Sequence, residues 1–321
     1  MSGAWQSKPK RPNLILGTIE NYAFYEIEPF LATLRETGFD GRLCMLCGPN
    51  ISSRTIRRIR ASGAEVIPYR PKFPFVQDPH PDAPRSLPEP IHIYNYRHFL
   101  YYDYLLKHGG EFDNVMLTDV RDVVFQRDPF EFPIAGKLHV AMENRGIPVG
   151  ACPYTSSWML AGYGAKVLER FRDNELSCAG TTIGPAPLVL RYLELMLEQI
   201  ALMKDAYNCA DQAAHNVLLH EGRLGRVAKS YNFEGPILTV GSEPRYRLDD
   251  HHRLANRDGS VIAVIHQYDR HPALARRIDR RVRPNAARRS IAWFVHLWRR
   301  IGRRIDKLHL IVRGHPAAAT S

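Results

Sequence analysis

Apolar runs and amphipathic stretches alternate along most of the chain. Short apolar runs bounded by polar residues predict strands, and apolar positions recurring every three or four residues predict helices. The first predicted strands are residues 13–16, 42–46, 64–68 and 115–118, and the helices between the first three are 27–37 and 52–62. Gly38 and Gly63 fit the ends of these helices. Strands and helices that alternate at this spacing predict βαβ units and an α/β fold with a mainly parallel sheet.

The same pattern continues in the second half of the chain. Further strands are predicted at 138–142, 227–231, 237–240 and 261–267, and helices at 92–107, 167–171, 188–203 and from 211 onward. Asp211 is a plausible N-cap of its helix. Two stretches lack a clear period: we expect a loop at 145–165 and a small-residue turn at 178–185. The proline-rich stretch 71–90 is predicted to be a loop as well.

The most informative stretch is 115–130, where two aspartates interrupt apolar residues. Asp119 and Asp122 follow a predicted buried strand, with Arg121 between them. An unpaired buried carboxylate is costly, so the two side chains are expected where the strand ends at a cleft. One hypothesis is a divalent metal site that holds a phosphate-bearing ligand. The alternative is a strand end at which one aspartate pairs with Arg121.

Other candidate residues are ambiguous when each is taken alone. Arg97 lies among aromatic residues, where it could bind a phosphate, stack on a tyrosine or pair with an aspartate. Thr18 belongs to a loop after the first strand, at the edge where such sheets bind ligands. Gly180 permits close approach of a backbone to a ligand. A lone histidine at a strand end, such as His266, is more often structural than a ligand.

The composition is that of a soluble globular protein, with 45% hydrophobic and 24% charged residues among 321. No apolar run approaches the roughly 20 residues of a membrane-spanning helix. The polar N-terminus has no apolar signal core, and the five cysteines are scattered, which favours a reducing cytoplasm. Cys44 and Cys47 form a CxxC without a second ligand pair, so buried thiols are expected rather than zinc.

Positive charge is concentrated at the C-terminus. Residues 270–321 contain 14 of the 44 Lys and Arg residues but only 2 of the 33 Asp and Glu residues. Residues 290–313 have a helical period, with an apolar side that includes Trp298 and arginines on the other side; this basic amphipathic stretch contains two tryptophans and suits an anionic membrane surface. Alternatives are a helix docked on the protein's own core or a nucleic-acid contact, and no recognition motif supports the latter.

Taken in order, these short motifs resemble the GT-A nucleotide-sugar glycosyltransferases, most closely the retaining groups with an Asp-x-Asp motif. The resemblance covers roughly residues 13–270. It consists of the strand–loop–helix opening at 14–34, the helix with Arg97, Asp119-Val-Arg-Asp122 with Asp128-Pro129, the stretch 179–184, Asp211-Gln212, and Val264-Ile265-His266. It implies a Rossmann-like GT-A domain at 13–270, between a polar tail at 1–12 and a basic amphipathic tail at 271–321.

The resemblance also implies an activity and roles for individual residues. The expected reaction is transfer of a sugar from a nucleoside diphosphate sugar to a glycan or lipid-linked acceptor, assisted by Mn²⁺ or Mg²⁺. Asp122, Asp119 and His266 would hold the metal, and Asp211 would be the catalytic residue that contacts the sugar or acceptor. The implied donor-binding residues are Thr18, Arg97, Asp119, Gly180, Thr181 and Gln212. This chain has Asp-x-x-Asp instead of Asp-x-Asp, so Asp122 matches the usual direct ligand and Asp119 falls one residue short.

Three further expectations complete the sequence-based hypothesis. The enzyme would be cytoplasmic and would associate peripherally with the inner face of the membrane through residues 285–313, with no nucleic-acid partner. A haloacid-dehalogenase-type phosphatase also places aspartates after a strand, but its motif belongs to the first strand with one intervening residue. The alternative from another class is a non-catalytic membrane- or nucleic-acid-binding protein with a GT-A-like body.

Overall fold

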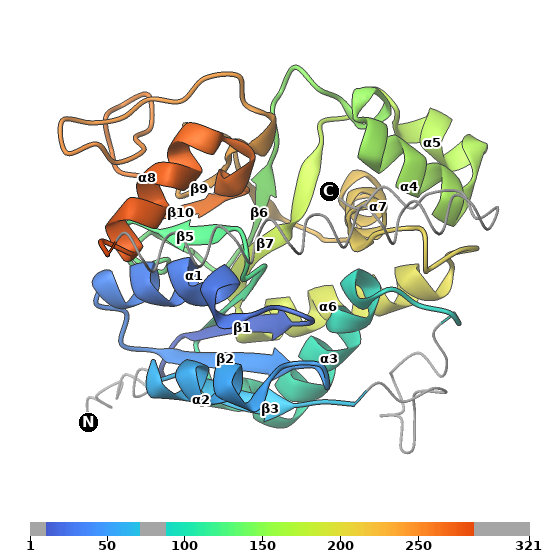
Figure 1. Cartoon of the computed structure of the whole chain (residues 1–321). Coiled ribbons are helices and arrows are strands. Elements are labelled where there is room, and N and C mark those ends of the chain that lie inside the picture. Colours follow the sequence, from blue (N-terminus) through green and yellow to red (C-terminus); the bar gives the residue numbers. More distant parts are fainter. Residues whose placement is uncertain (1–10, 71–87, 286–321) are drawn as a thin grey trace, which may run out of the picture.

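The computed structural model describes residues 11–70 and 88–285. A central seven-stranded sheet has the order β3-β2-β1-β4-β7-β6-β8, and a smaller sheet has the order β5-β10-β9. Helices flank the central sheet on both faces (Figure 1). The predicted α/β fold with a mainly parallel central sheet is therefore confirmed. The basic helix predicted at 290–313 lies outside the described residues.

The strands of the central sheet are mostly short and buried. They are β1 (Leu14–Ile19), β2 (Arg42–Cys47), β3 (Glu65–Pro68), β4 (Asn114–Thr118), β6 (Leu138–Met142), β7 (Ser177–Pro185) and β8 (Val227–Ser230). β1 pairs in parallel with both β2 and β4, whereas β7 runs antiparallel to its neighbours β4 and β6. The carboxyl ends of β1 and β4 therefore meet at one edge, where ligands bind in sheets of this kind.

Side chains alternate between two hydrophobic cores. Leu14 and Leu16 of β1 face a core with the aromatic helix α3, and Ile15 faces a core with α1. The larger helices are α1 (Phe24–Glu36), α2 (Ser53–Ala61), α3 (Ile93–His108), α4 (Pro153–Tyr163), α5 (Ala165–Phe171), α6 (Ala186–Ala201), α7 (Asp211–His220) and α8 (Pro272–Val282). None of the helices within the described ranges is both long enough and apolar enough to cross a membrane.

The small sheet and the short helical turns complete the fold. β5 (Val123–Phe125) pairs antiparallel with β10 (Val264–His266), which pairs in parallel with β9 (Ile237–Thr239). Single 3₁₀ turns occur at η1 (Gly109–Glu111), η2 (Val149–Ala151), η3 (Val240–Ser242) and η4 (Tyr268–Arg270). The stretch 119–122 passes from the end of β4 in the large sheet to the start of β5 in the small one.

Three local predictions were wrong. The stretch 178–185 is not a turn but most of β7, whose small and β-branched residues are buried on both faces except at Pro185. Residues 153–163 form α4 instead of a loop, and Pro153 occupies the first helical turn, where proline is tolerated. Asp211 is not the N-cap of α7, because Ala210 holds that position and the Asp211 side chain is engaged elsewhere.

Candidate active site

A pocket opens where β1 and β4 end, at the carboxyl edge of the parallel strands. It encloses about 910 Å³ of space, including the part open to solvent. The lining includes Thr18, Arg97, Asp119, Asp122, Gly180, Asp211, Gln212 and His266. The fold thus brings together eight of the nine residues predicted from the sequence. The ninth, Thr181, is fully buried in β7 and is not part of the lining.

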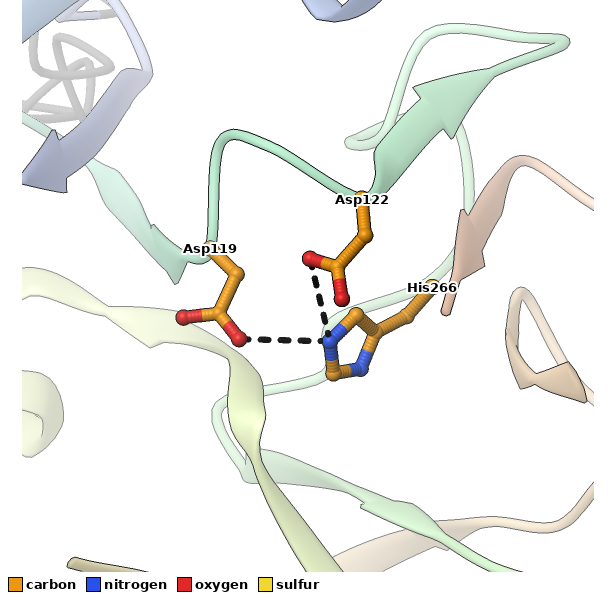
Figure 2. Close-up of side chains that lie close together, drawn as sticks. All are labelled: Asp119, Asp122 and His266. Carbon is orange, nitrogen blue, oxygen red and sulfur yellow. Dashed lines mark ion pairs between the residues drawn. The ribbon is translucent and has the colours of Figure 1, made fainter. Parts of the chain in front are cut away.

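Two carboxylates and an imidazole of this lining converge on one another (Figure 2). His266 Nε2 lies 3.2 Å from Asp119 Oδ2 and 3.7 Å from Asp122 Oδ1. One ligand atom from each of the three side chains falls within 4.8 Å of the others. Carboxylate oxygens and an imidazole nitrogen at this separation form a donor set that can close around a divalent cation.

The backbone fixes each member of this cluster from a different strand. The Asp119 amide donates to the Gly180 carbonyl at 2.9 Å, and the Gln267 amide donates to the Asp122 carbonyl at 2.8 Å. His266 is the last residue of β10, followed by Gln267 with a left-handed φ of 61°. Gly180 leaves the space that the cluster needs, since an added Cβ would lie 2.3 Å from His266 Cε1.

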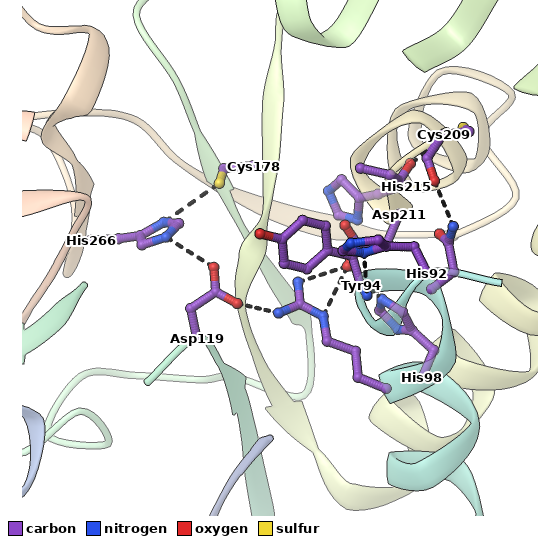
Figure 3. A network of polar contacts seen from close by, with 12 residues as sticks. His92, Tyr94, His98, Asp119, Cys178, Cys209, Asp211, His215 and His266 are labelled. Atoms are coloured by element: carbon purple, nitrogen blue, oxygen red, sulfur yellow. Dashed lines mark hydrogen bonds and ion pairs between the residues drawn. The ribbon is translucent and has the colours of Figure 1, made fainter. Parts of the chain in front are cut away.

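A buried network extends from His266 and Asp119 to Asp211 and His98 (Figure 3). Arg97 links Asp119 to Asp211 within it. The Arg97 guanidinium forms an ion pair with Asp119 on one side and donates to Asp211 Oδ2 from Nε at 3.0 Å and Nη2 at 2.6 Å on the other. His98 Nε2 lies 2.9 Å from the same Asp211 oxygen. Arg97 and Asp211 are both less than 10% exposed. Adjacent residues of α3 therefore hold the start of α7 in place.

The cationic groups in this region stabilise the ionised forms of Asp119 and Asp211. Burial works to raise the pKa of Asp119, but Arg97 and His266 outweigh burial and hold the pKa below its ordinary value. Burial likewise opposes the ionised form of Asp211, yet Arg97 and His98 keep its pKa lowered. Both carboxylates are therefore ionised at neutral pH and available as acceptors.

His266 is oriented from both sides of its ring. Nδ1 lies 3.5 Å from Cys178 Sγ, and Nε2 faces the two aspartates. Burial works to lower the pKa of His266, but Cys178 and the two carboxylates outweigh burial, so the pKa lies well above its ordinary value. An imidazolium between two carboxylates and a divalent cation bound by the same three side chains are alternative ways to balance this charge.

The ion pair expected at the aspartate stretch is present, and the metal site at the same stretch stays a prediction. Arg121 Nη2 lies 3.6 Å from Asp122 Oδ2 and 3.5 Å from Asp269 Oδ2, so the ion pair exists alongside the three-residue cluster. Arg97 is likewise paired with aspartates while it lines the pocket. Gln212 Nε2 donates to Thr155 Oγ1 at 2.9 Å and Glu143 Oε1 at 3.2 Å, which fixes its amide at the pocket wall.

Several lining residues had no role in the sequence-based interpretation. Cys178 precedes the expected glycine stretch, and Arg270 was seen only as the start of a basic tail. Tyr22, Tyr94 and Trp158 supply aromatic surface from three separate segments. His98 is next to Arg97 and on a buried helix face, so the helical period alone assigns it to the core. Only its position beside Asp211 in space identifies it.

Comparisons with known proteins leave the site to be interpreted from its own chemistry. No model of a known protein family matches the chain, and a search among curated proteins also found no match.

Proposed function

We propose that the protein is a metal-assisted glycosyltransferase of the GT-A type. It would transfer a sugar from a nucleoside diphosphate sugar to a glycan or lipid-linked acceptor. The observation that carries the proposal is the convergence of Asp119, Asp122 and His266 beside Arg97 in a pocket at the carboxyl ends of β1 and β4. A phosphate-bearing ligand needs cations at that edge, and a metal there would supply one.

The residues present fit a hard divalent cation. Two carboxylates suit Mg²⁺ or Mn²⁺, and the imidazole nitrogen is better suited to Mn²⁺ than to Mg²⁺. Gly180 carries no side chain, so His266 and Asp119 can pack against it without displacement of their ligand atoms. Asp119 would contribute Oδ2, because its other oxygen already accepts from Arg97. The metal, when bound, neutralises the donor diphosphate and makes it a better leaving group.

The charges of the pocket explain why a metal would be required. Its lining contains four carboxylates, those of Glu20, Asp119, Asp122 and Asp211, and three guanidinium groups, those of Arg97, Arg121 and Arg270. The first two arginines are already paired with aspartates. His266 adds a further cation when protonated, so the lining is nearly balanced, and a divalent cation in the cluster would add the positive charge that attracts a diphosphate.

Among the three arginines of the pocket, Arg270 is the one most available to bind the donor diphosphate. Within the described part of the chain it makes no ion pair and no side-chain hydrogen bond, and it is exposed at the pocket rim. A free guanidinium binds phosphate oxygens in a bidentate manner without first breaking another pair. We therefore assign Arg270 to the donor diphosphate, a role that the sequence did not indicate.

Asp211 and Gln212 would act on the sugar or the acceptor. Asp211 Oδ2 is occupied by Arg97 and His98, whereas Oδ1 makes no hydrogen bond to any described residue. That oxygen is available to a sugar or acceptor hydroxyl. Thr18 and Gly180 line the same pocket, while Thr181 would act only through the packing of β7. The proposed membrane contact through 285–313 rests on sequence, since 286–313 lies outside the described residues.

Asp122→Asn tests the proposal with a change of charge and almost none of shape. Nucleoside diphosphate sugars are screened by thermal shift with and without Mn²⁺, and hydrolysis of the stabilising donor is then measured. The wild type should be stabilised only when donor and Mn²⁺ are present together. The variant should lose both this stabilisation and donor hydrolysis, because a neutral amide is a poor ligand for the cation.

A matched control comes from the surface of α3. Asp103→Asn also removes one carboxylate, but Asp103 is an exposed partner of Lys107, so donor binding should be unchanged. Turnover by Asp122→Asn equal to that of the wild type would refute the proposed metal site. A wild type that binds donor but never hydrolyses or transfers the sugar would instead favour the alternative of a non-catalytic binding protein.

A further inference from the structure

Helix α8 carries three arginines that have no acidic partner among the described residues. The helix contains a single carboxylate, Asp279, and that side chain pairs with Arg283. The neighbouring Arg281 pairs with Glu36 of α1. Arg276, Arg277 and Arg280 remain, at spacings that place them on one side of the helix. Like charges this close repel one another, so they do not stabilise the helix.

Two pockets share Arg277, one of these three arginines. The first is lined by Tyr246, Ala273 and the three arginines, which makes it a cationic cup. The second also includes Arg277 and holds about 680 Å³ of space, including its open part. Its apolar lining comes from the small sheet, α8 and the loop before β10: Val124, Phe125, Leu248, Leu254, Ile265, Leu274 and Ile278.

The solvent-exposed part of the second pocket's lining combines one leucine with polar residues. Leu248 is 37% exposed at its edge, which makes it one of the few large hydrophobic side chains left in contact with water. His251 and His252 lie in the same rim, and the pocket lining includes no carboxylate. A cationic cup joined to an apolar cavity is complementary to a molecule with an anionic head and a hydrocarbon chain.

We propose that these two pockets bind one anionic phospholipid of a membrane. Its phosphate would lie among Arg276, Arg277 and Arg280, and the start of an acyl chain would enter the pocket beside Leu248 and Leu274. Residues 286–321 offer little counter-charge, because their sequence contains a single acidic residue, Asp306. This site is separate from the predicted tail contact and does not depend on the proposed sugar transfer.

The small sheet connects the proposed lipid site with the candidate active site. Val124 and Ile265 are paired across β5 and β10, and they face the core beneath α8. His266, the next residue of β10, turns to the opposite side and joins Asp119 and Asp122. The small sheet thus has the core beneath α8 on one face and His266 on the other. Binding of a lipid would hold the active-site pocket close to the membrane surface.

The test uses the full chain and three probes. These are phosphatidylcholine vesicles with or without phosphatidylglycerol, dodecyl phosphate below its micellar concentration, and inorganic phosphate. The triple variant Arg276→Ala, Arg277→Ala, Arg280→Ala should bind anionic vesicles about 100-fold more weakly, since each cation near the surface contributes about fivefold. It should also lose dodecyl phosphate binding. Leu248→Ser should weaken dodecyl phosphate binding about threefold and leave inorganic phosphate unaffected.

Matched controls separate this site from net charge and general apolar surface. The triple variant Arg54→Ala, Arg57→Ala, Arg60→Ala removes the same charge from exposed positions on α2 and should change vesicle binding by about twofold at most. Leu202→Ser removes a leucine that is 67% exposed elsewhere and should have no effect on dodecyl phosphate binding.

Four results would overturn the lipid site. The first two concern anionic vesicles: an equal loss of binding in the two arginine variants, or full binding by the α8 variant. The third is binding of inorganic phosphate by the wild type as tightly as dodecyl phosphate. The fourth is an equal effect of the two leucine substitutions on dodecyl phosphate binding. Donor hydrolysis in the α8 variant should equal that of the wild type. Its absence in both proteins would refute the proposed function and leave the lipid site standing.

Discussion

Gly180 is the position where a single methyl group tests the geometry of the candidate active site. An added Cβ would lie 2.3 Å from His266 Cε1, 2.8 Å from His266 Nε2 and 2.8 Å from Asp119 Oδ2. Neither side chain can move aside freely. His266 is 2% exposed and has Cys178 on its other nitrogen, and Asp119 is paired with Arg97. Gly180→Ala must therefore push the imidazole and the carboxylate apart.

The size of the effect follows from two contributions. An extra carbon in a closely packed interior costs about 1–3 kcal/mol of unfolding free energy. Weakening the charge-assisted contact of 3.2 Å between His266 Nε2 and Asp119 Oδ2 costs a similar amount, but one displacement causes both, so they do not add. We expect Gly180→Ala to lower the free energy of unfolding by about 2 kcal/mol. Displaced ligands should weaken Mn²⁺ binding by about 10- to 100-fold.

Urea unfolding gives the stability change, and calorimetric titration with Mn²⁺ gives the affinity. Gly110→Ala is the matched control, because a Cβ at Gly110 meets no atom within 4 Å and its φ is not positive. This control should change stability by about 0.5 kcal/mol or less and leave Mn²⁺ affinity unchanged. If Gly180→Ala equals Gly110→Ala in both measurements, the close approach at β7 is refuted. A loss of stability with unchanged Mn²⁺ affinity would refute the ligand assignment alone.

Two further predictions concern binding of the donor diphosphate by Arg270 and the pH dependence of stability caused by the buried His215. Arg270→Ala should raise the KM for the donor about tenfold with little change in unfolding free energy, because it removes an unpaired exposed guanidinium. Steady-state kinetics measure the KM, and an unchanged value would contradict this prediction. Burial lowers the pKa of His215 to about 4 in the folded protein. Between pH about 6.5 and pH about 4, this histidine is therefore protonated in the unfolded chain but neutral in the folded protein. Stability should therefore fall by up to about 3 kcal/mol between pH 6.5 and pH 4. Urea unfolding across this range should show a smaller loss for His215→Gln, and equal slopes for both proteins would contradict the assignment.

The strands and helices with a strong period could be predicted from the sequence, and those whose environment overrides the period could not. β1 and α6 were predicted because one buries nearly all of its residues and the other has a clear apolar face. β7 was missed because its glycine and small residues resemble a turn, although it lies between two strands with both faces covered. α4 was missed because its apolar residues are spread around the helix.

The candidate site was predicted as a set of residues but not as a network. Asp119, Asp122 and His266 could be selected because each charged or titratable group interrupts or ends an apolar run. The pairing of Arg97 with Asp211 spans 114 positions, and no local pattern encodes it. Ion pairs of this kind are set by how α3 and α7 pack, so they emerge only once the fold brings the two helices together.

The unusual Asp-x-x-Asp spacing has a structural reason that a motif comparison does not contain. Asp119 directly follows β4 and is fixed by the Gly180 carbonyl of β7 in the large sheet. Asp122 directly precedes β5 and is fixed by the Gln267 amide next to β10 in the small sheet. The two residues between them bridge the sheets: Val120 is buried, and Arg121 pairs with Asp122 and Asp269. Each aspartate is held by partners outside the stretch 119–122, and the two residues between them span the distance from one sheet to the other. Asp119 and Asp122 can therefore both reach His266 although two residues separate them.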